Sequence, residues 1–513
     1  MNITGLSPNS LVIKDTNGFE NELHRQDTIL QNEKNGNAND SDFEQKNQKN
    51  IFTKTRKTVK KIENQDVSWP IRNKLIVLVI WVVVIATLAS NYLNLNKIET
   101  ELFKTNRERL SSLKEEKKRQ IENYFDQMKK QAIIFSSNFT VVSAMEDFTM
   151  GFVNAFKESE GKLTSEYENK LRDRYRYQVK MTHGADELDL KGWYPYGKTS
   201  QILQSQYISE NKYPIGEKHK LDRADGDSLY SEAHQEYHPY IRQLLETFGY
   251  YDIFLVEPET GFIVYSVYKE IDYATSLKTG PYANTPIGRA FKSALKTNDR
   301  DAVIMEDFET YAPSYNAPAA FIASPMYSGE KLTGVLIFQV SIEKIDDIMT
   351  GNHAGKGEVY LIGQDYKLRS NSRLFLDNPH HYFEQLQTLK VKPELIEKSK
   401  ALNISIGINE ITTPGTIAAI KGKSGFSTFN GYRGVSVLSA YSPLEILGLK
   451  WGILAELDEA EAFAMYDELR NETIMSSVIM IVLLSILGVL VSNNTAENIH
   501  KIVNAAKNIK PDN

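Results

Sequence analysis

The chain has no cysteine among its 513 residues, so disulfides, thiolate zinc sites and cysteine nucleophiles are all excluded. A large translocated domain without disulfides fits a bacterial exported domain better than an animal ectodomain. The chain also lacks a strong excess of one charge, because 60 Lys and Arg stand against 66 Asp and Glu. Nothing in this balance suggests nucleic acid as a partner. The length allows two or three ordinary domains.

Glycine and proline are missing between Ile71 and Met150. In the second half of this stretch apolar residues recur every three or four positions, which is amphipathic helix spacing. The pattern predicts a long stalk helix over 97–160, which either forms a coiled-coil seam or packs on its own domain. The charged stretch Lys114–Arg119 interrupts the apolar face, so we expect solvent exposure there.

Two long apolar runs stand out, Leu75–Leu88, which can extend to Leu95, and Ile474–Val491. Each supplies the roughly 20 residues that a helix needs to cross a bilayer. The alternative, a buried core helix, fits less well because the first run is apolar all round and flanked by charge. We therefore predict transmembrane helices at 73–95 and 473–492.

Lysine and arginine are unevenly placed around both spans. Six precede the first span (Arg56, Lys57, Lys60, Lys61, Arg72 and Lys74) and four follow it, whereas one precedes the second span and three follow it. The positive-inside bias then places both termini in the cytoplasm and the large loop outside the inner membrane. Residues 1–70 are polar and charged and predict a disordered cytoplasmic tail rather than a signal peptide.

The stretch from Phe248 to Leu277 predicts an antiparallel hairpin. Two β-rich runs, Tyr250–Val256 and Phe262–Tyr268, flank a short loop that contains Pro258 and Gly261. A helix over Pro286–Lys296 and strands over 319–327 and 332–341 follow. A sheet of at least four strands with a preceding helix and one crossover helix is an α+β pattern.

A second, similar unit begins near Gly357. A short hairpin is expected from Val359–Ile362 and Lys367–Ser370, followed by strands over Ile417–Lys421, Val435–Tyr441 and Trp451–Leu457. We therefore predict two related sheet domains in tandem, 161–350 far from the membrane and 351–465 near it. Asp458–Glu461 has the form of a capping box, which would start the helix into the second span.

Several segments together resemble the double-Cache sensor region of bacterial transmembrane receptors. They are GYYDIFLVEPETGFIVYSVYKEIDYATSL at 249–277, GVLIFQVSIEKIDDIM at 334–349 and YRGVSVLSAYSPLEILGLKWGILAELDEAEAF at 432–463. The segment ISENKYPIGEKHKLDRADGDSLYSEAHQEYHP at 208–239 is similar to the distal region of some chemoreceptors and membrane-bound nucleotide cyclases. The resemblance covers most of residues 97–490.

This resemblance implies two PAS-like modules on a stalk helix, a homodimer, and an extracytoplasmic ligand detector that signals by small helix displacements. The implied output is of the chemotaxis, cyclase or kinase type. Residues 493–513 look like the first helix of a HAMP linker, with Asn498 where proline is usual. No output domain follows, so either the chain is part of a longer protein or its output lies on a cytoplasmic partner.

Two patterns that suggest other chemistry have weak support. Gly192–Thr199 matches the phosphate-binding pattern GxxxxGK[ST], but an acidic stretch without strand character precedes it and Trp, Tyr and Pro fill the loop. His234 and His238 would share a helix face, but the residue after His234 is Gln235 rather than the glutamate of zinc proteases. Pro239 should also end that helix early. We interpret both histidines as packing or surface residues and expect no metal or cofactor.

A ligand pocket is expected in the distal module, where polar and aromatic side chains converge near a sheet. The candidate ligand-binding residues are Trp193, Tyr207, Arg223, Tyr251, Asp252, Lys269 and Asp272. Asp252 lies within an apolar strand, so its carboxylate needs a partner, which could be a ligand amine, Lys269 or a backbone group. An internal salt bridge or a capping role is an equally good interpretation of Asp252.

The leading hypothesis is a non-enzymatic sensory receptor for a small molecule. An extracytoplasmic enzyme would need a nucleophile–base pair or a metal cluster, and no motif in the sequence supports either. The remaining alternative is a membrane-anchored adaptor or structural protein that recruits a partner through its N-terminal tail.

Overall fold

A computed structural model describes residues 71–159, 164–183, 190, 192–195, 197–351 and 357–507. The predicted cytoplasmic tail, 1–70, lies outside the described residues, as does 508–513. The chain divides into two compact units, one made of its two ends and the other of Thr87–Val478.

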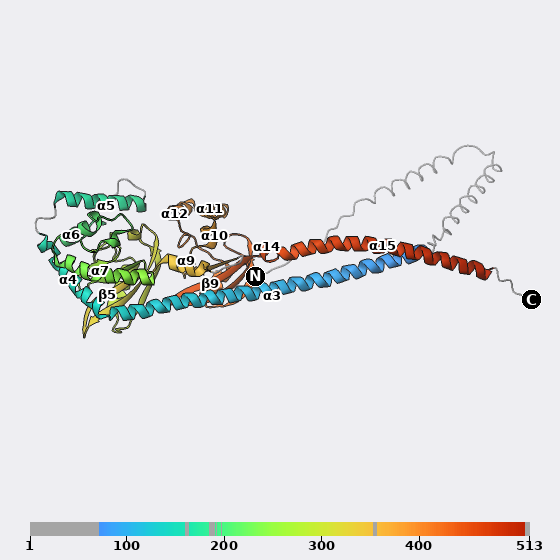
Figure 1. The fold of residues 1–513 in the computed structure, drawn as a ribbon, viewed down its shortest axis with the longest axis horizontal. Helices are drawn as coiled ribbons and strands as arrows, with labels where there is room; N and C mark the ends of the chain where they lie inside the picture. Colours follow the sequence, from blue (N-terminus) through green and yellow to red (C-terminus); the bar gives the residue numbers. More distant parts are fainter. Residues whose placement is uncertain are drawn as a thin grey trace, which may run out of the picture. The chain divides into compact units, whose positions relative to one another are not determined.

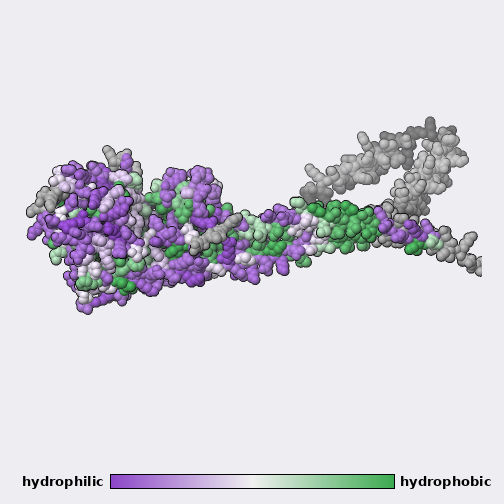
Figure 2. All heavy atoms as spheres, in the orientation of Figure 1, coloured by the Kyte–Doolittle hydropathy of each residue, from purple (hydrophilic) through white to green (hydrophobic). Residues whose placement is uncertain are grey.

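Two helices carry the predicted spans, α3 (Ile71–Ser136) and α15 (Ala464–Lys507). Both are long and apolar enough to cross a membrane, judged by length and composition. Figure 2 shows strongly apolar residues gathered over these parts of the two helices. The residues expected to form a HAMP-like helix continue α15 without a break as far as Lys507.

The predicted stalk consists of two helices rather than one. α3 ends at Ser136, and α4 (Phe139–Glu158) begins after Asn138, whose side chain accepts a hydrogen bond from the backbone N–H of Val141. Neither Gly nor Pro is needed for this break, because an asparagine N-cap satisfies a free N–H of the new helix.

α3 runs along both sheets (Figure 1), and its charged stretch is exposed on one side only: Glu115, Glu116 and Arg119 are exposed as predicted, whereas Lys114 and Lys117 are buried. Lys117 is 2% exposed, and its ammonium donates to the carbonyls of Ile348 and Gly351 at the end of α9 (Ile342–Thr350). A lysine that binds the last carbonyls of a helix stabilises that helix end. The Lys117 ammonium therefore connects α3 to the segment between the two sheets.

The first sheet has five antiparallel strands in the order β2-β1-β5-β4-β3. β1 (Asp252–Val256) and β2 (Ile263–Ser266) form the predicted hairpin, and α8 (Pro286–Lys296) is the predicted crossover helix. The remaining strands are β3 (Ile304–Thr310), β4 (Pro318–Ser328) and β5 (Lys331–Gln339). β3 was not predicted, because its acidic edge sequence lacks a buried alternation.

Further helices precede the hairpin: α5 (Ser165–His183), α6 (Lys198–Gln204), the π-helix η1 (Ser205–Ser209), the 3₁₀ turn η2 (Lys218–Lys220) and α7 (Leu229–Phe248). α7 contains Pro239, so the prediction that this proline ends the helix is wrong. The helix continues because Tyr237, His238 and Ile241 on its inner face are all buried.

The second sheet has four antiparallel strands in the order β6-β9-β8-β7. They are β6 (Glu358–Ile362), β7 (Gly425–Asn430), β8 (Ser436–Ile446) and β9 (Leu449–Asp458). Its helices are α10 (Arg373–Asp377), α11 (Pro379–Thr388), α12 (Pro393–Leu402) and α13 (Pro414–Ile420). The coarse prediction of mixed helix and sheet, with two antiparallel sheets after a long helix, is confirmed.

Two local predictions for this second sheet module are wrong, and a third is confirmed in part. Ile417–Lys421 is not a strand, because Thr413 and Thr416 form a capping box and Pro414 starts α13. Lys367–Ser370 pairs with the end of β6 as predicted, although it is not a full strand: Ile362 and Leu368 form an antiparallel bridge, and the Arg369 N–H donates to the Leu361 carbonyl (2.9 Å). Asp458 makes no capping bond to α14 (Glu459–Ala462), because its carboxylate binds Arg433 instead.

Candidate functional site

The loop that follows β2 directs charged side chains into the first module. Residues 267–275 fold back along β2, with bonds from the Ile263 N–H to the Thr275 carbonyl (2.9 Å) and from the Ala274 N–H to the Ile263 carbonyl (3.0 Å). Positive φ angles at Lys269 and Ala274 allow this reversal. As a result Lys269, Glu270 and Asp272 are all buried, within one short segment.

The carboxylate of Asp252 finds its partners in the protein backbone. It accepts hydrogen bonds from the N–H groups of Ile253 (2.7 Å), Val267 (2.9 Å) and Tyr268 (3.2 Å), and from the Ser266 hydroxyl (3.1 Å). Burial raises the pKa of Asp252, although these hydrogen bonds favour the charged form. Asp252 therefore organises the turn after β2, which is the capping role that the sequence left open.

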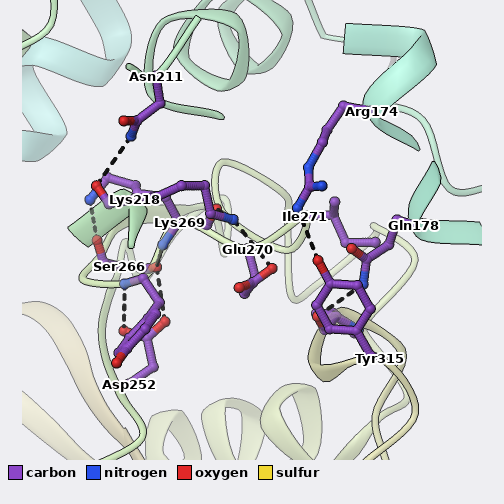
Figure 3. A network of polar contacts seen from close by, with 12 residues as sticks. Arg174, Gln178, Asn211, Lys218, Asp252, Ser266, Lys269, Glu270, Ile271 and Tyr315 are labelled. Atoms are coloured by element: carbon purple, nitrogen blue, oxygen red, sulfur yellow. Dashed lines mark hydrogen bonds and ion pairs between the residues drawn. The ribbon is translucent and has the colours of Figure 1, made fainter. Parts of the chain in front are cut away.

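The Lys269 ammonium lies in an aromatic cage. It donates to the carbonyl of Ser266 and lies 4.2 Å, 5.1 Å and 5.7 Å from the ring centroids of Tyr265, Tyr273 and Tyr207. Figure 3 shows it beside Ser266 and Asp252. Burial lowers the pKa of Lys269, opposed by the Asp252 carboxylate.

A second buried cation, Lys218, connects this turn to an acidic group. Its ammonium donates to the Lys269 carbonyl (2.7 Å) and lies 3.3 Å from Oε2 of Glu270. That Glu270 oxygen has no hydrogen bond among the described residues. Burial lowers the pKa of Lys218, and Glu270 opposes this. The pair is thus buried and incompletely satisfied.

Asp272 is likewise only half satisfied. The Tyr311 hydroxyl donates to its Oδ2 (2.5 Å), whereas Oδ1 has no hydrogen-bond partner among the described residues. Burial raises the pKa of Asp272 to about 7. A buried carboxylate oxygen without a donor is costly unless a proton or a ligand satisfies it.

A cavity of about 380 Å³ lies beside this cluster. Lys218 and Arg174 line it, together with Lys170, Asp173 and residues 208–209 and 213–215. Arg174, from α5, donates to the Tyr315 hydroxyl (3.0 Å), and Figure 3 shows both residues next to Glu270. Gln178, one turn further along α5, donates to the carbonyls of Ala312 and Pro313 (3.2 Å and 3.1 Å). The cavity is therefore cation-rich, and its lining residue Lys218 connects it to the buried carboxylate of Glu270.

A separate cavity of about 370 Å³ lies on the other side of η1. Ser205 and Gln206 of η1 line this cavity, whereas Ile208 and Ser209 of η1 line the first one. π-helical turns are uncommon and occur frequently at functional sites.

The structure brings five of the seven predicted ligand residues together. Asp252, Lys269 and Asp272 belong to the buried cluster, Tyr207 contacts Lys269, and Tyr251 stacks on Tyr268 at 5.7 Å. The other two lie elsewhere. Arg223 lines the second cavity and binds Gln235 and Asp227 (2.6 Å and 2.9 Å), and Trp193 packs on the apolar cluster around Tyr175 and Tyr194.

Sequence reasoning missed Arg174, Gln178, Lys218, Glu270, Tyr311 and Tyr315. Arg174 and Gln178 lie in α5, whose many charges give no sign of which side chain points inward. Glu270 lies between two residues that were predicted, and its inward direction follows from the turn at Lys269. Lys218 comes from a loop whose path only the folded chain decides.

The histidines and the GxxxxGK[ST] segment have structural partners. His234 and His238 are buried and stacked at 4.2 Å, with contacts to the carbonyls of Asp222 and His219 (2.7 Å and 2.6 Å). Burial lowers the pKa of both histidines. Lys198 pairs with Glu168 at 3.0 Å. No group of three His, Asp or Glu that could hold a metal occurs in the described part of the chain.

Comparison with known proteins gives matches to solved structures alone. No protein-family model matches the chain, and no curated protein matches it. The ligand-binding domain of the Pseudomonas aeruginosa amino acid chemoreceptor PctB, solved with L-Arg, is 16% identical, with 45% of this chain and 82% of that chain covered and a TM-score of 0.28.

Two other matches are of the same kind. The periplasmic sensory domain of the Campylobacter jejuni chemoreceptor Tlp1 is 12% identical, with 59% of this chain and 94% of that chain covered and a TM-score of 0.28. The ligand-binding domain of the Pseudomonas fluorescens chemoreceptor CtaA, solved with L-serine, is 14% identical, with 42% and 76% covered and a TM-score of 0.26. All three are ligand-binding or sensory domains of chemoreceptors.

Proposed function

We propose that this chain is a two-span receptor of the bacterial inner membrane that detects a small extracytoplasmic molecule and has no catalytic activity. In this proposal residues 161–350 form the membrane-distal sensor and 351–465 a PAS-like transmitter. The observation that carries it is the buried cluster around Glu270 and Asp272, in which Oδ1 of Asp272 has no donor among the described residues and Glu270 pairs with Lys218 at the wall of a cation-lined cavity. Such convergent polar groups suit ligand binding better than stability.

The charges of the cluster favour a small molecule that carries both an ammonium and a carboxylate. Arg174 and Lys218 line the cavity and can bind a carboxylate, with Arg174 able to do so in a bidentate manner. Oδ1 of Asp272, which has no donor among the described residues, can accept from an ammonium, while Glu270 would share its oxygens between the ligand and Lys218. A ligand with both groups would supply the partners that this buried cluster lacks. A ligand without charged groups could not do so.

Signal transfer would follow the chain from β9 to the second span. β9 leads through α14 directly into α15. Ligand binding needs only a different affinity for two arrangements of the modules in order to shift them. We propose that homodimers pass this shift to a cytoplasmic partner, with both termini on the cytoplasmic side.

The test is a thermal-unfolding screen of the full chain in nanodiscs against amino acids, simple amines and simple carboxylates. We expect saturable stabilisation by amino-acid-like compounds, because ligand binding to the folded state raises its stability. Asp272→Asn should weaken the response at least tenfold. Asp347→Asn, on the exposed side of α9, is the matched control and should respond as the unaltered chain does.

Two outcomes would count against the proposal. One is a folded chain that no compound of the panel stabilises. The other is a compound that stabilises the Asp272→Asn variant as strongly as the unaltered chain, which would place binding outside this cluster.

A further inference from the structure

A third cavity, of about 320 Å³, lies between the two sheet modules of the larger unit. From the first module it is lined by the end of β3 and the start of β4, and from the second by the turn after β6 and by α12. Its polar lining residues are Glu309, Thr310 and Asn316 on one side and Asp365, Lys367 and Lys398 on the other. Anything bound here would contact both modules.

The acidic groups of this cavity already have cationic partners. Glu309 pairs with Arg289 (2.5 Å), and Asp365 pairs with Arg369 (2.8 Å). Each arginine also pairs with a second carboxylate, Arg289 with Glu306 (2.7 Å) and Arg369 with Asp307 (2.8 Å), so the two acids of the cavity are only partly neutralised.

The lysines of the cavity lack such partners. Within the described residues, neither Lys367 nor Lys398 has a carboxylate within ion-pair distance. Lys398 donates only to the Thr310 hydroxyl, at 3.0 Å, across the junction between the modules. Two unneutralised ammonium groups thus remain in one partly enclosed space.

The two lysines are close enough to affect each other. Burial lowers the pKa of Lys398, and the charge of Lys367 lowers it further. An anion between them would offset both the desolvation and the repulsion. Lysine serves as a point-charge ligand for phosphate and carboxylate groups, so the chemistry of the cavity fits a small anion.

We propose that this cavity is a second binding site, which takes a small anion carrying carboxylate or phosphate groups and bridges the two modules. The bridge would lie beside an existing link, in which Arg369 binds both oxygens of Asp307 (2.8 Å and 2.9 Å) and the Trp451 indole N–H donates to the same carboxylate (3.2 Å). A bound anion adds Lys367 and Lys398 to that link. It would make the junction stiffer and so modulate the transfer of a signal from the first site.

The test uses the full chain in nanodiscs of zwitterionic lipid, titrated with inorganic phosphate or with citrate. Thermal unfolding and isothermal calorimetry report binding, and potassium chloride at equal ionic strength is the reference. We expect saturable stabilisation by at least one of the two anions beyond that of chloride. A preference for phosphate or for citrate then distinguishes the two chemical sources.

The variants Lys367→Gln and Lys398→Gln, singly and together, assign the site. We expect each single variant to weaken anion binding several-fold and the pair to weaken it at least tenfold. Lys392→Gln, an exposed lysine just before α12, should bind as the unaltered chain does. The single variants serve if the double variant does not fold.

Three results would overturn the assignment: no stabilisation beyond chloride, equal binding by the double variant, or loss of anion binding in Asp272→Asn. The last would place the anion in the first site instead. Retained anion binding by Asp272→Asn would support two separate sites, whether or not the first site proves to bind an amino acid.

Discussion

Both sheet modules bury carboxylates, but the modules differ in how many hydrogen-bond donors these carboxylates have. In the second module Glu456 accepts hydrogen bonds from the hydroxyls of Tyr360 (3.0 Å) and Ser439 (3.1 Å). Glu358 accepts from the Tyr432 hydroxyl (2.7 Å) and the Arg373 N–H (2.9 Å). In the first module Oδ1 of Asp272 has no donor among the described residues, and Oε2 of Glu270 has only the Lys218 ammonium, 3.3 Å away.

This difference separates structural roles from binding roles. A buried carboxylate with a donor at each oxygen, as Glu358 has, fixes the arrangement of its neighbours. One whose partners are incomplete destabilises the empty protein and gains most from a ligand. We therefore expect the second module to respond to substitution mainly through stability, and the first through ligand affinity as well.

The largest expected effect is at the link between the modules. Arg369→Ala removes a guanidinium that is 4% exposed and leaves Asp307 without its main partner, so we expect a loss of about 3 kcal/mol. Arg289→Ala, which breaks more exposed pairs with Glu306 and Glu309, should cost less than about 1 kcal/mol. Thermal and denaturant unfolding of both variants in nanodiscs would measure the difference. Equal losses would show that the junction is not a special point of contact.

The pH dependence of stability should distinguish the carboxylates of the two modules. Burial raises the pKa of both Asp272 and Glu456 to about 7. Between roughly pH 4 and pH 7 the folded state then holds protons that the unfolded state releases. Stability should fall as pH rises through this window, by at most about 1.4 kcal/mol per pH unit for each group.

A bound ammonium would favour the charged form of Asp272 and so remove its part of this slope, whereas the part due to Glu456 should remain. Unfolding temperatures between pH 4 and pH 8, with and without ligand, test this. In the Asp272→Asn variant, the slope of stability against pH should lose only the part that the ligand changes. A slope that is equally sensitive to ligand in Asp272→Asn would contradict the assignment.

The smallest effect is expected from removing single hydroxyls. Tyr432→Phe removes the donor to Glu358, and Tyr311→Phe removes the donor to Asp272, at a cost of about 1–3 kcal/mol or less in each case. We expect Tyr432→Phe to leave ligand affinity unchanged and Tyr311→Phe to alter it. Calorimetric titration of the two variants with the same ligand makes the comparison, and a reversed result would exchange the roles of the modules.

Much of the fold could be predicted from local patterns. The hairpin of β1 and β2 follows from two β-rich runs around Pro258 and Gly261, and α8 was predicted at its observed bounds. Predictions failed where one local sequence pattern is compatible with both a helix and a strand. Ile417–Lys421 is β-branched and apolar enough for a strand, but the capping box at Thr413 and Thr416 makes it a helix.

The candidate site was less predictable. Asp252 was recognised because a charge in an apolar strand needs a partner, yet its backbone partners come from the turn after β2. Arg223 and Trp193 have suitable chemistry but lie on other parts of the module. Arg174 could not be chosen among the charges of α5, because its direction depends on how that helix packs.

The amino-acid sequence by itself determined the two apolar spans, the stalk, the two β-rich units and the absence of cysteine chemistry. These features follow from local composition and periodicity, because apolar residues recur at the positions where burying their surface lowers the free energy of folding. Only the tertiary structure decided which charges meet: Lys218 with Glu270, Arg369 with Asp307, and Lys367 with Lys398 around one cavity. Such pairings depend on where distant segments pack, and no local pattern in the chain records that.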